Sequence, residues 1–190
     1  MFSRIVAFMS VPTGNPELVE AQRIALTRLV PLLYFILLVN GWVLSATFFG
    51  KAPDLLTVHL AGALTAVYVV RFVMWWRMRG MAMTTERAAA ELRRMNRIAA
   101  ALSVACPAWA LALFPYGGAA EQFHVILFLT ISMISAMFCM LHLRSASVLA
   151  TVIVGTAFVG FLVSTGNPAF IAMAANVFFV PVALLVVVLV

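Results

Sequence analysis

Charged side chains are scarce in this sequence. Asp, Glu, Lys and Arg make up only 9% of its 190 residues, whereas hydrophobic residues make up 65%. A water-soluble domain carries roughly 25% charged residues, so a soluble fold of this length would have too little polar surface to cover its core. The composition therefore excludes the ordinary soluble classes and predicts a membrane protein.

Cysteine is almost absent as well. The two cysteines, Cys106 and Cys139, lie inside apolar runs, without the paired spacing of a metal site or of a disulfide framework. We interpret both as small buried hydrophobic residues. The sequence also lacks a glycine-rich phosphate loop, a carboxylate pair and a nucleophile–base pair, so we predict no catalytic residue, no metal site and no cofactor.

Charge is also missing from the middle of the long apolar runs. No Asp, Glu, Lys or Arg lies near the centre of any expected membrane span. Ion-coupled and proton-coupled transporters usually need such residues. This absence therefore argues against a coupled transporter.

Basic residues, in contrast, are concentrated in one short stretch. Residues 71–97 hold seven of the twelve lysines and arginines, and the net charge is +6. Positive charge beside membrane spans is typical of the cytoplasmic side. No basic–aromatic module accompanies it, so nucleic-acid binding is not predicted. We expect five arginines of this stretch to contact anionic lipid head groups: Arg77, Arg79, Arg93, Arg94 and Arg97.

The apolar runs predict six membrane-spanning helices, since about 20 apolar residues cross the hydrocarbon core. Eleven basic residues fall on one side of these spans and only Lys51 falls on the other, which predicts that both termini are cytoplasmic. The expected fold class is an all-α membrane protein with six transmembrane helices arranged as three hairpins. The expected spans are 29–49, 55–76, 98–114, 123–143, 147–163 and 169–190.

Two domains follow from this pattern. Residues 1–28 form a cytoplasmic N-terminal segment, and residues 29–190 form the transmembrane domain. Within the first, Asn15 is expected to cap a short amphipathic helix that begins at Pro16. Its apolar face is predicted to hold Leu18, Ala21, Ala25 and Leu29.

The far end of the sequence carries its own expectation. The last apolar run reaches Val190 without the aromatic or basic residues that usually anchor a span at the interface. We therefore expect a cytoplasmic output domain to follow it.

The three outer hairpins resemble one another weakly. Each has a glycine, Gly50, Gly117 or Gly166, followed by a short polar stretch and the returning helix. His59 and His124 stand at the start of two of the returning helices. Either an internal repeat or the shared need for a glycine turn explains the pattern.

Polar groups at membrane depth are the default functional candidates. His59 and His124 are expected at similar depth, and if their spans are adjacent the two imidazoles could line a pocket for a small ligand. Two other interpretations stay open: hydrogen-bonded histidines at the interface, and a metal or haem site.

Other residues could complete such a pocket. Asn40 and Asn176 are expected within spans, where hydrogen bonds between helices are the simplest role for an amide. They could also approach the same outer cavity. Its apolar walls would be formed by Trp42, Trp109 and Tyr116, which otherwise belong to an interfacial aromatic belt.

Several short motifs match a known pattern. The stretch NPELVEAQRIALTR (Asn15–Arg28) leads into PLLYFILLVN (Pro31–Asn40), and APDLLTV (Ala52–Val58), LFPYG (Leu113–Gly117) and TGNP (Thr165–Pro168) follow. Together they resemble the six-span N-terminal membrane region of bacterial cyclic-di-GMP signalling proteins. Those proteins carry GGDEF (diguanylate cyclase) and often EAL (phosphodiesterase) domains after the membrane part. Neither signature occurs in this chain, so no catalytic residue is carried over.

The resemblance implies a sensory or anchoring module of the bacterial inner membrane. Such a module would control a C-terminal cytoplasmic enzyme, respond to an unknown small-molecule signal and act as a homodimer among membrane lipids. Two alternatives stay open: a small stand-alone transporter component, and a haem- or metal-binding membrane protein that uses His59 and His124.

Overall fold

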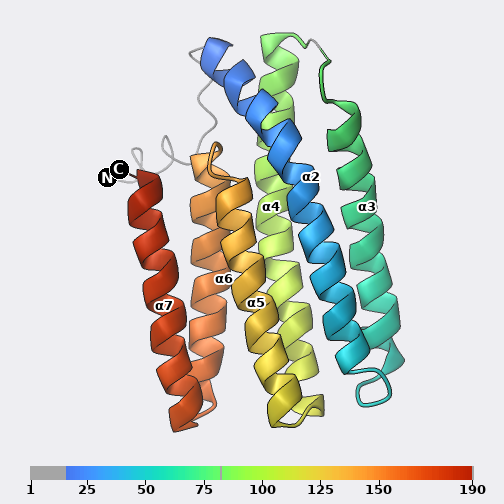
Figure 1. Cartoon of the computed structure of the whole chain (residues 1–190), viewed down its shortest axis with the longest axis vertical. Coiled ribbons are helices and arrows are strands. Elements are labelled where there is room, and N and C mark those ends of the chain that lie inside the picture. The colour runs from blue at the N-terminus through green and yellow to red at the C-terminus, as the bar shows by residue number, and fades with distance from the viewer. Residues whose placement is uncertain (1–15, 82, 190) are drawn as a thin grey trace.

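The computed structural model of the protein describes residues 16–81 and 83–189. Within these ranges every regular element is a helix (Figure 1). The expectations for residues 1–15, including the Asn15 cap, and for Val190 lie outside the described residues. The long helices are α2 (Pro16–Thr47), α3 (Ala61–Arg77), α4 (Thr85–Leu113), α5 (Ala119–Cys139), α6 (Arg144–Ser164) and α7 (Pro168–Leu189), and the short ones are the π-helix η1 (Leu55–Leu60) and the 3₁₀-helix η2 (Phe114–Tyr116).

Five helices of the described chain are long and apolar enough to cross a membrane. They are α2, η1 with α3, α4 with η2, α5 and α6, while α7 contributes a shorter apolar stretch, Pro168–Phe179. Large apolar side chains also cover the outside of the bundle, as a lipid environment requires. Examples are Phe35, Phe49, Val70, Val104 and Phe138, all more than half exposed. The all-helical class is therefore confirmed for the described residues, five of the helices could cross a membrane, and the sixth span stays a prediction.

Several helix ends follow the local signals in the sequence. The first described helix begins at Pro16, where the fixed φ of proline suits the first turn. Thr84 precedes α4 with extended backbone, as an N-cap residue should. Gly80 follows α3 at a φ of +74°, a conformation that glycine adopts without steric cost.

The outer turns use glycine for two different reasons. Gly50 and Gly166 have φ values of +74° and +66°. Gly117 has an ordinary negative φ, but a Cβ there would lie 2.4 Å from Glu121 Cβ and 2.8 Å from Phe48 Cε1. Close packing, rather than turn geometry, therefore requires a glycine at 117, which weakens the case for an internal repeat.

The first helix is longer than expected, and its inward face differs from the predicted one. A single helix, α2, runs from Pro16 through Pro31 to Thr47. Leu18 is 42% exposed, whereas Val19 and Leu26 are fully buried. Because α2 is continuous, its first turns share the inward stripe of the membrane part. That stripe repeats at intervals of three, four and seven residues: Val19, Leu26, Val30, Leu33, Leu37 and Leu44.

The packing of the helices departs from three simple hairpins. The pairs α2–α3 and α6–α7 pack extensively, but α4 packs mainly on α6, and α5 packs on α2 and α6. Figure 1 shows α2 and α4 projecting beyond the α5–α6 turn at one end of the bundle. That end also holds the α3–α4 loop with Arg79, so we call it the basic end, and the end with the other three turns the outer end.

The two ends of the bundle should be accessible from opposite sides of the membrane. Single cysteines replacing the exposed residues Asp54 and Ala119 lie at the outer end, and those replacing the exposed Arg87 and Arg93 lie at the basic end. A membrane-impermeant maleimide should label the first pair in spheroplasts and the second pair only in inverted vesicles.

The unmodified protein is the control, because Cys106 and Cys139 are both buried. Labelling of the outer-end cysteines only from the cytoplasmic side would contradict this orientation.

Candidate functional site

The two candidate histidines lie apart in the bundle. His59 belongs to η1 and is exposed, whereas His124 belongs to α5 and is partly buried. Among the described residues neither η1 nor α3 packs against α5, because α2 lies between them. The geometry therefore does not bring the two imidazoles into one pocket.

His124 instead ties α5 to the end of α2. Its Nδ1 lies 2.8 Å from Thr47 Oγ1, which also lies 2.9 Å from the carbonyl oxygen of Val43. A hydroxyl has one proton to donate. Because Thr47 donates its proton to the Val43 carbonyl, the imidazole N–H of His124 donates the hydrogen bond to Thr47.

The two asparagines also differ. Asn40 Nδ2 donates to the carbonyl oxygen of Phe128, 3.3 Å away, and so links α2 to α5. This contact is the hydrogen bond between helices that a membrane-embedded amide needs. Asn176 is exposed on α7, where it does not share a cavity with Asn40.

The three candidate aromatic residues do not form one wall. Trp109 is 5% exposed, and its Nε1 donates to the carbonyl oxygen of Leu56 at 2.8 Å. Its ring meets that of Phe128 edge to face, with centroids 5.7 Å apart. Trp42 and Tyr116 are 44% and 46% exposed. Trp109 thus belongs to the core of the outer half, and the other two face its surroundings.

The π-helix η1 is the feature of the outer half that the sequence pattern did not indicate. Leu56 accepts a hydrogen bond from Trp109, and Thr57 accepts one from Ser45 of α2. The wider π turn displaces backbone carbonyls from their usual partners. Side-chain donors of two neighbouring helices use these carbonyls, which fixes the start of α3.

A salt bridge joins two outer turns. Lys51 Nζ lies 2.5 Å from Glu121 Oε1, in the first turn of α5 and ahead of its apolar stretch. The hydrogen bond from Lys51 holds the pKa of the Glu121 carboxyl below its ordinary value. Together with the Thr47–His124 contact, it fastens α5 to α2 at the outer end.

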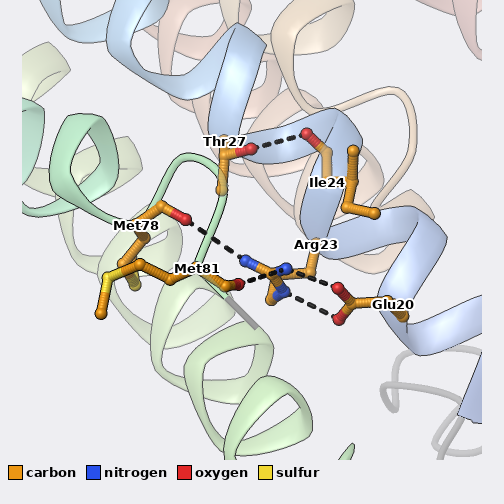
Figure 2. A network of polar contacts seen from close by, with 6 residues as sticks. All are labelled: Glu20, Arg23, Ile24, Thr27, Met78 and Met81. Carbon is orange, nitrogen blue, oxygen red and sulfur yellow. Dashed lines mark hydrogen bonds and ion pairs between the residues drawn. The ribbon is translucent and has the colours of Figure 1, made fainter. Parts of the chain in front are cut away.

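Arg23 is the centre of a second network, at the basic end (Figure 2). It is 4% exposed and bonds through two nitrogens to the carboxylate of Glu20, at 2.8 and 2.5 Å. It also donates to the carbonyl oxygens of Met78 (3.4 Å) and Met81 (3.0 Å). The bond from Arg23 lowers the pKa of Glu20. Arg23 therefore clamps the α3–α4 loop onto α2.

Arg79 strengthens the same connection from the other side. Its Nε donates to the carbonyl oxygen of Thr27 at 2.9 Å, and its Nη2 to that of Arg28 at 3.3 Å. The guanidinium carbon lies 4.0 Å from the ring centroid of Trp76, within the range of a cation–π interaction. Arg79 thus has a structural role beyond the predicted lipid contact.

The other arginines predicted to face lipid are exposed. Arg77, Arg93, Arg94 and Arg97 lie on the surface of α3 or α4. Arg94 also lies 3.9 Å from Glu91, a surface pair of small energetic weight. These four positions are available to head groups, and their contact with lipid stays a prediction.

The sequence analysis missed a buried polar cluster between α2, α3 and α4. Arg71, the first residue of the basic stretch 71–97, is only 4% exposed. Its Nη2 lies 3.7 Å from Met95 Sδ, and the Tyr34 hydroxyl lies 4.0 Å from the same sulfur. Arg71 faces inward because it shares one stripe of α3 with Tyr68 and Trp75, three and four residues away. This spacing was readable from the sequence.

A narrow apolar crevice adjoins this cluster. Its free volume is about 50 Å³, and its lining includes Tyr34, Met95 and Cys106. The hydroxyl of Tyr68 lies 2.8 Å from Cys106 Sγ, behind that wall. The crevice continues along residues of α4, α5 and α6, including Met133 and Ala150.

Comparison with known proteins gives no relative: the chain matches no family model, no curated protein and no solved structure. The resemblance to cyclic-di-GMP signalling proteins therefore stays a prediction. Within residues 16–81 and 83–189, no group of three or more His, Cys, Asp or Glu side chains is placed to hold a metal ion.

The Trp109–Leu56 hydrogen bond should stabilise the outer half measurably. Trp109→Phe removes the donor and leaves the buried Leu56 carbonyl without it, so we expect a loss of about 1 kcal/mol in the free energy of unfolding. Trp42→Phe, at an exposed position of α2, is the matched control and should change little. Equilibrium unfolding in mixed micelles measures both, and equal stability of the two variants would contradict this role.

The Lys51–Glu121 salt bridge should make stability depend on pH. Because the folded-state pKa of Glu121 is lowered, its contribution is present above the ordinary carboxyl pKa and is lost as pH falls through the folded value. The thermal midpoint of the wild type should exceed that of Glu121→Gln at pH 7, and the difference should shrink as the pH falls below the ordinary carboxyl pKa of about 4.3. In a Lys51→Met background the difference should be smaller at neutral pH. A difference that stays the same from pH 7 to acidic pH would exclude the salt bridge as its cause.

Proposed function

We propose that the chain is a sensory and anchoring module of a bacterial cyclic-di-GMP signalling protein. In this proposal it crosses the inner membrane six times, with α7 as the sixth span and both termini in the cytoplasm. It controls a C-terminal diguanylate cyclase or phosphodiesterase and acts as a homodimer. The resemblance of the motifs between Asn15 and Pro168 suggests the family. The basic end of the bundle would connect the membrane helices to the cytoplasmic enzyme.

The observation that carries the proposal is the Arg23 clamp. A sensor needs an element that transmits a change inside the bundle to the side where the enzyme lies. Arg23 and Arg79 join the first turns of α2 to the end of α3 and the α3–α4 loop, through backbone carbonyls. A shift of α2 against α3 therefore moves the α3–α4 loop as well.

The shape of the basic end supports the same role. The first turns of α2 and α4 project beyond the α5–α6 turn (Figure 1). Exposed arginines near the start of α4, such as Arg87 and Arg93, lie where anionic head groups of the inner leaflet would meet them. Each such residue near an anionic surface contributes about 1 kcal/mol, which would hold the projecting helices at a fixed height.

A signal can act on such a module only by binding two helix arrangements with different affinity. The network at the basic end gives one arrangement in which α2 and the α3–α4 loop are joined. An arrangement with the clamp released is the simplest second state. The signal would then change the enzyme by shifting the balance between them.

Releasing the clamp should alter the output of the full-length protein. Arg23→Gln removes the guanidinium that contacts Glu20, Met78 and Met81, so we expect cellular cyclic-di-GMP to change at least about threefold, a shift of under 1 kcal/mol in the balance between states. Arg28→Gln, at an exposed position of the same helix, is the matched control and should leave the level unchanged. Cyclic-di-GMP is measured in cell extracts at matched membrane levels of each protein.

Two results would overturn the proposal. Cyclic-di-GMP at the level of empty-vector cells, when the wild-type full-length protein is expressed, would contradict the proposed output. Equal levels for Arg23→Gln and the wild type would contradict the clamp as the transmitting element.

A further inference from the structure

Arg71 carries a buried charge without an adequate partner. It is 4% exposed, and neither its Nε nor its Nη1 has a hydrogen-bond partner among the described residues. The indole Nε1 of Trp75, which is fully buried beside it, also has none. Arg71 lies 5.9 Å from the Trp75 ring centroid. Three donor nitrogens of two buried side chains therefore lack acceptors in the same part of the bundle.

Such a group is costly in a membrane protein. A buried charge normally has an opposite charge and a full set of hydrogen bonds, and no acidic side chain forms a salt bridge with Arg71 within the described ranges. Each buried group of this kind needs a physical explanation, and a bound anion supplies one. The chemistry that satisfies a guanidinium best is a carboxylate, which is planar, monoanionic and able to accept two hydrogen bonds at once.

A weak acceptor, the sulfur of Met95, occupies the position in which a carboxylate could contact Arg71. Met95 Sδ lies 3.7 Å from Arg71 Nη2 and 4.0 Å from the Tyr34 hydroxyl. A thioether is a poor acceptor, and its side chain is flexible. Met95 and Tyr34 also line the apolar crevice. Movement of Met95 alone would therefore open a path between the guanidinium and the crevice.

The crevice has the length of an alkyl chain. Along α4 its lining runs from Met95 to Pro107, and on the α5 side it runs from Leu129 to Met140, the residue after the helix. At about 1.5 Å per residue these stretches correspond to roughly 17 Å. In a fully extended hydrocarbon chain of about twelve to fourteen carbons the ends lie a similar distance apart.

We propose that this site binds a single-chain amphiphile with a carboxylate head, such as a fatty acid of medium length. The carboxylate accepts hydrogen bonds from Arg71 and Tyr34 in place of Met95, and the tail lies along the crevice.

The crevice must widen to admit this ligand, because its free volume is only about 50 Å³. Three of its lining residues are methionines, Met95, Met133 and Met140, whose unbranched side chains repack readily. Binding would thus move α4 and α5 relative to α2, which the proposed sensor needs. In that respect the inference rests on the proposed function, whereas binding itself does not.

Direct binding tests the site separately from signalling. The protein is reconstituted in phosphatidylcholine nanodiscs, and radiolabelled dodecanoate and dodecanol are titrated, with empty nanodiscs subtracted. Dodecanoate should bind saturably, and about tenfold more tightly than dodecanol, because only the carboxylate neutralises Arg71. Arg71→Gln should abolish this preference. Arg77→Gln, at an exposed position on the same helix, should keep it.

A second variant blocks the tail rather than the head. Ala136→Phe fills the crevice and should reduce dodecanoate binding about tenfold, whether or not Arg71→Gln folds. Equal binding of dodecanoate and dodecanol by the wild type, or full binding by Ala136→Phe, would overturn the site. Confirmed binding without any effect of dodecanoate on cyclic-di-GMP in cells would leave the site standing and count against the proposed function alone.

Discussion

A polar group that faces lipid or an apolar core must find its partner within the protein, and this bundle meets that requirement mainly through α2. Its side chains donate to carbonyls of other elements: Arg23 to the α3–α4 loop, Asn40 to α5 and Ser45 to η1. Carbonyls at its start accept from Arg79. Water cannot replace the bonds of Asn40 and Ser45, which lie within the expected span. The central position of α2 between α3 and α5 follows from them as much as from its apolar stripe.

Much of the helical architecture could be predicted because it depends on local physics. Apolar runs of sufficient length, a proline at position 16, a threonine at position 84 and a glycine at position 80 act within a few residues of themselves. The order in which the helices pack, in contrast, does not depend on local physics. It depends on which faces are complementary across the bundle, and the strong α4–α6 contact has no counterpart in the linear pattern. The prediction of the apolar face in the first turns of α2 was wrong for the same reason, because it was derived from residues 18–29 alone.

The candidate site shows the same limit. Sequence alone could rank polar residues by expected depth, and it selected Asn40 and Trp109, which do hold helices together. It could not say that His59 and His124 stand on elements separated by α2. It also grouped Arg71 with the surface arginines by proximity in the chain, although a period of three and four residues links it to the buried Tyr68 and Trp75. Charge counting and helical periodicity gave different answers for this residue, and periodicity was correct.

The Asn40–Phe128 contact also has a consequence for biosynthesis. Its two residues are separated by 88 positions in the chain. During insertion from the ribosome, α2 and α3 are complete while α5 has yet to be synthesised. The face of α2 that will receive α5 then meets lipid or the insertion machinery, with the amide of Asn40 lacking its final partner. The bundle is thus assembled in a fixed order. Until α5 is inserted, lipid or the insertion machinery must contact the face of α2 that later packs on α5.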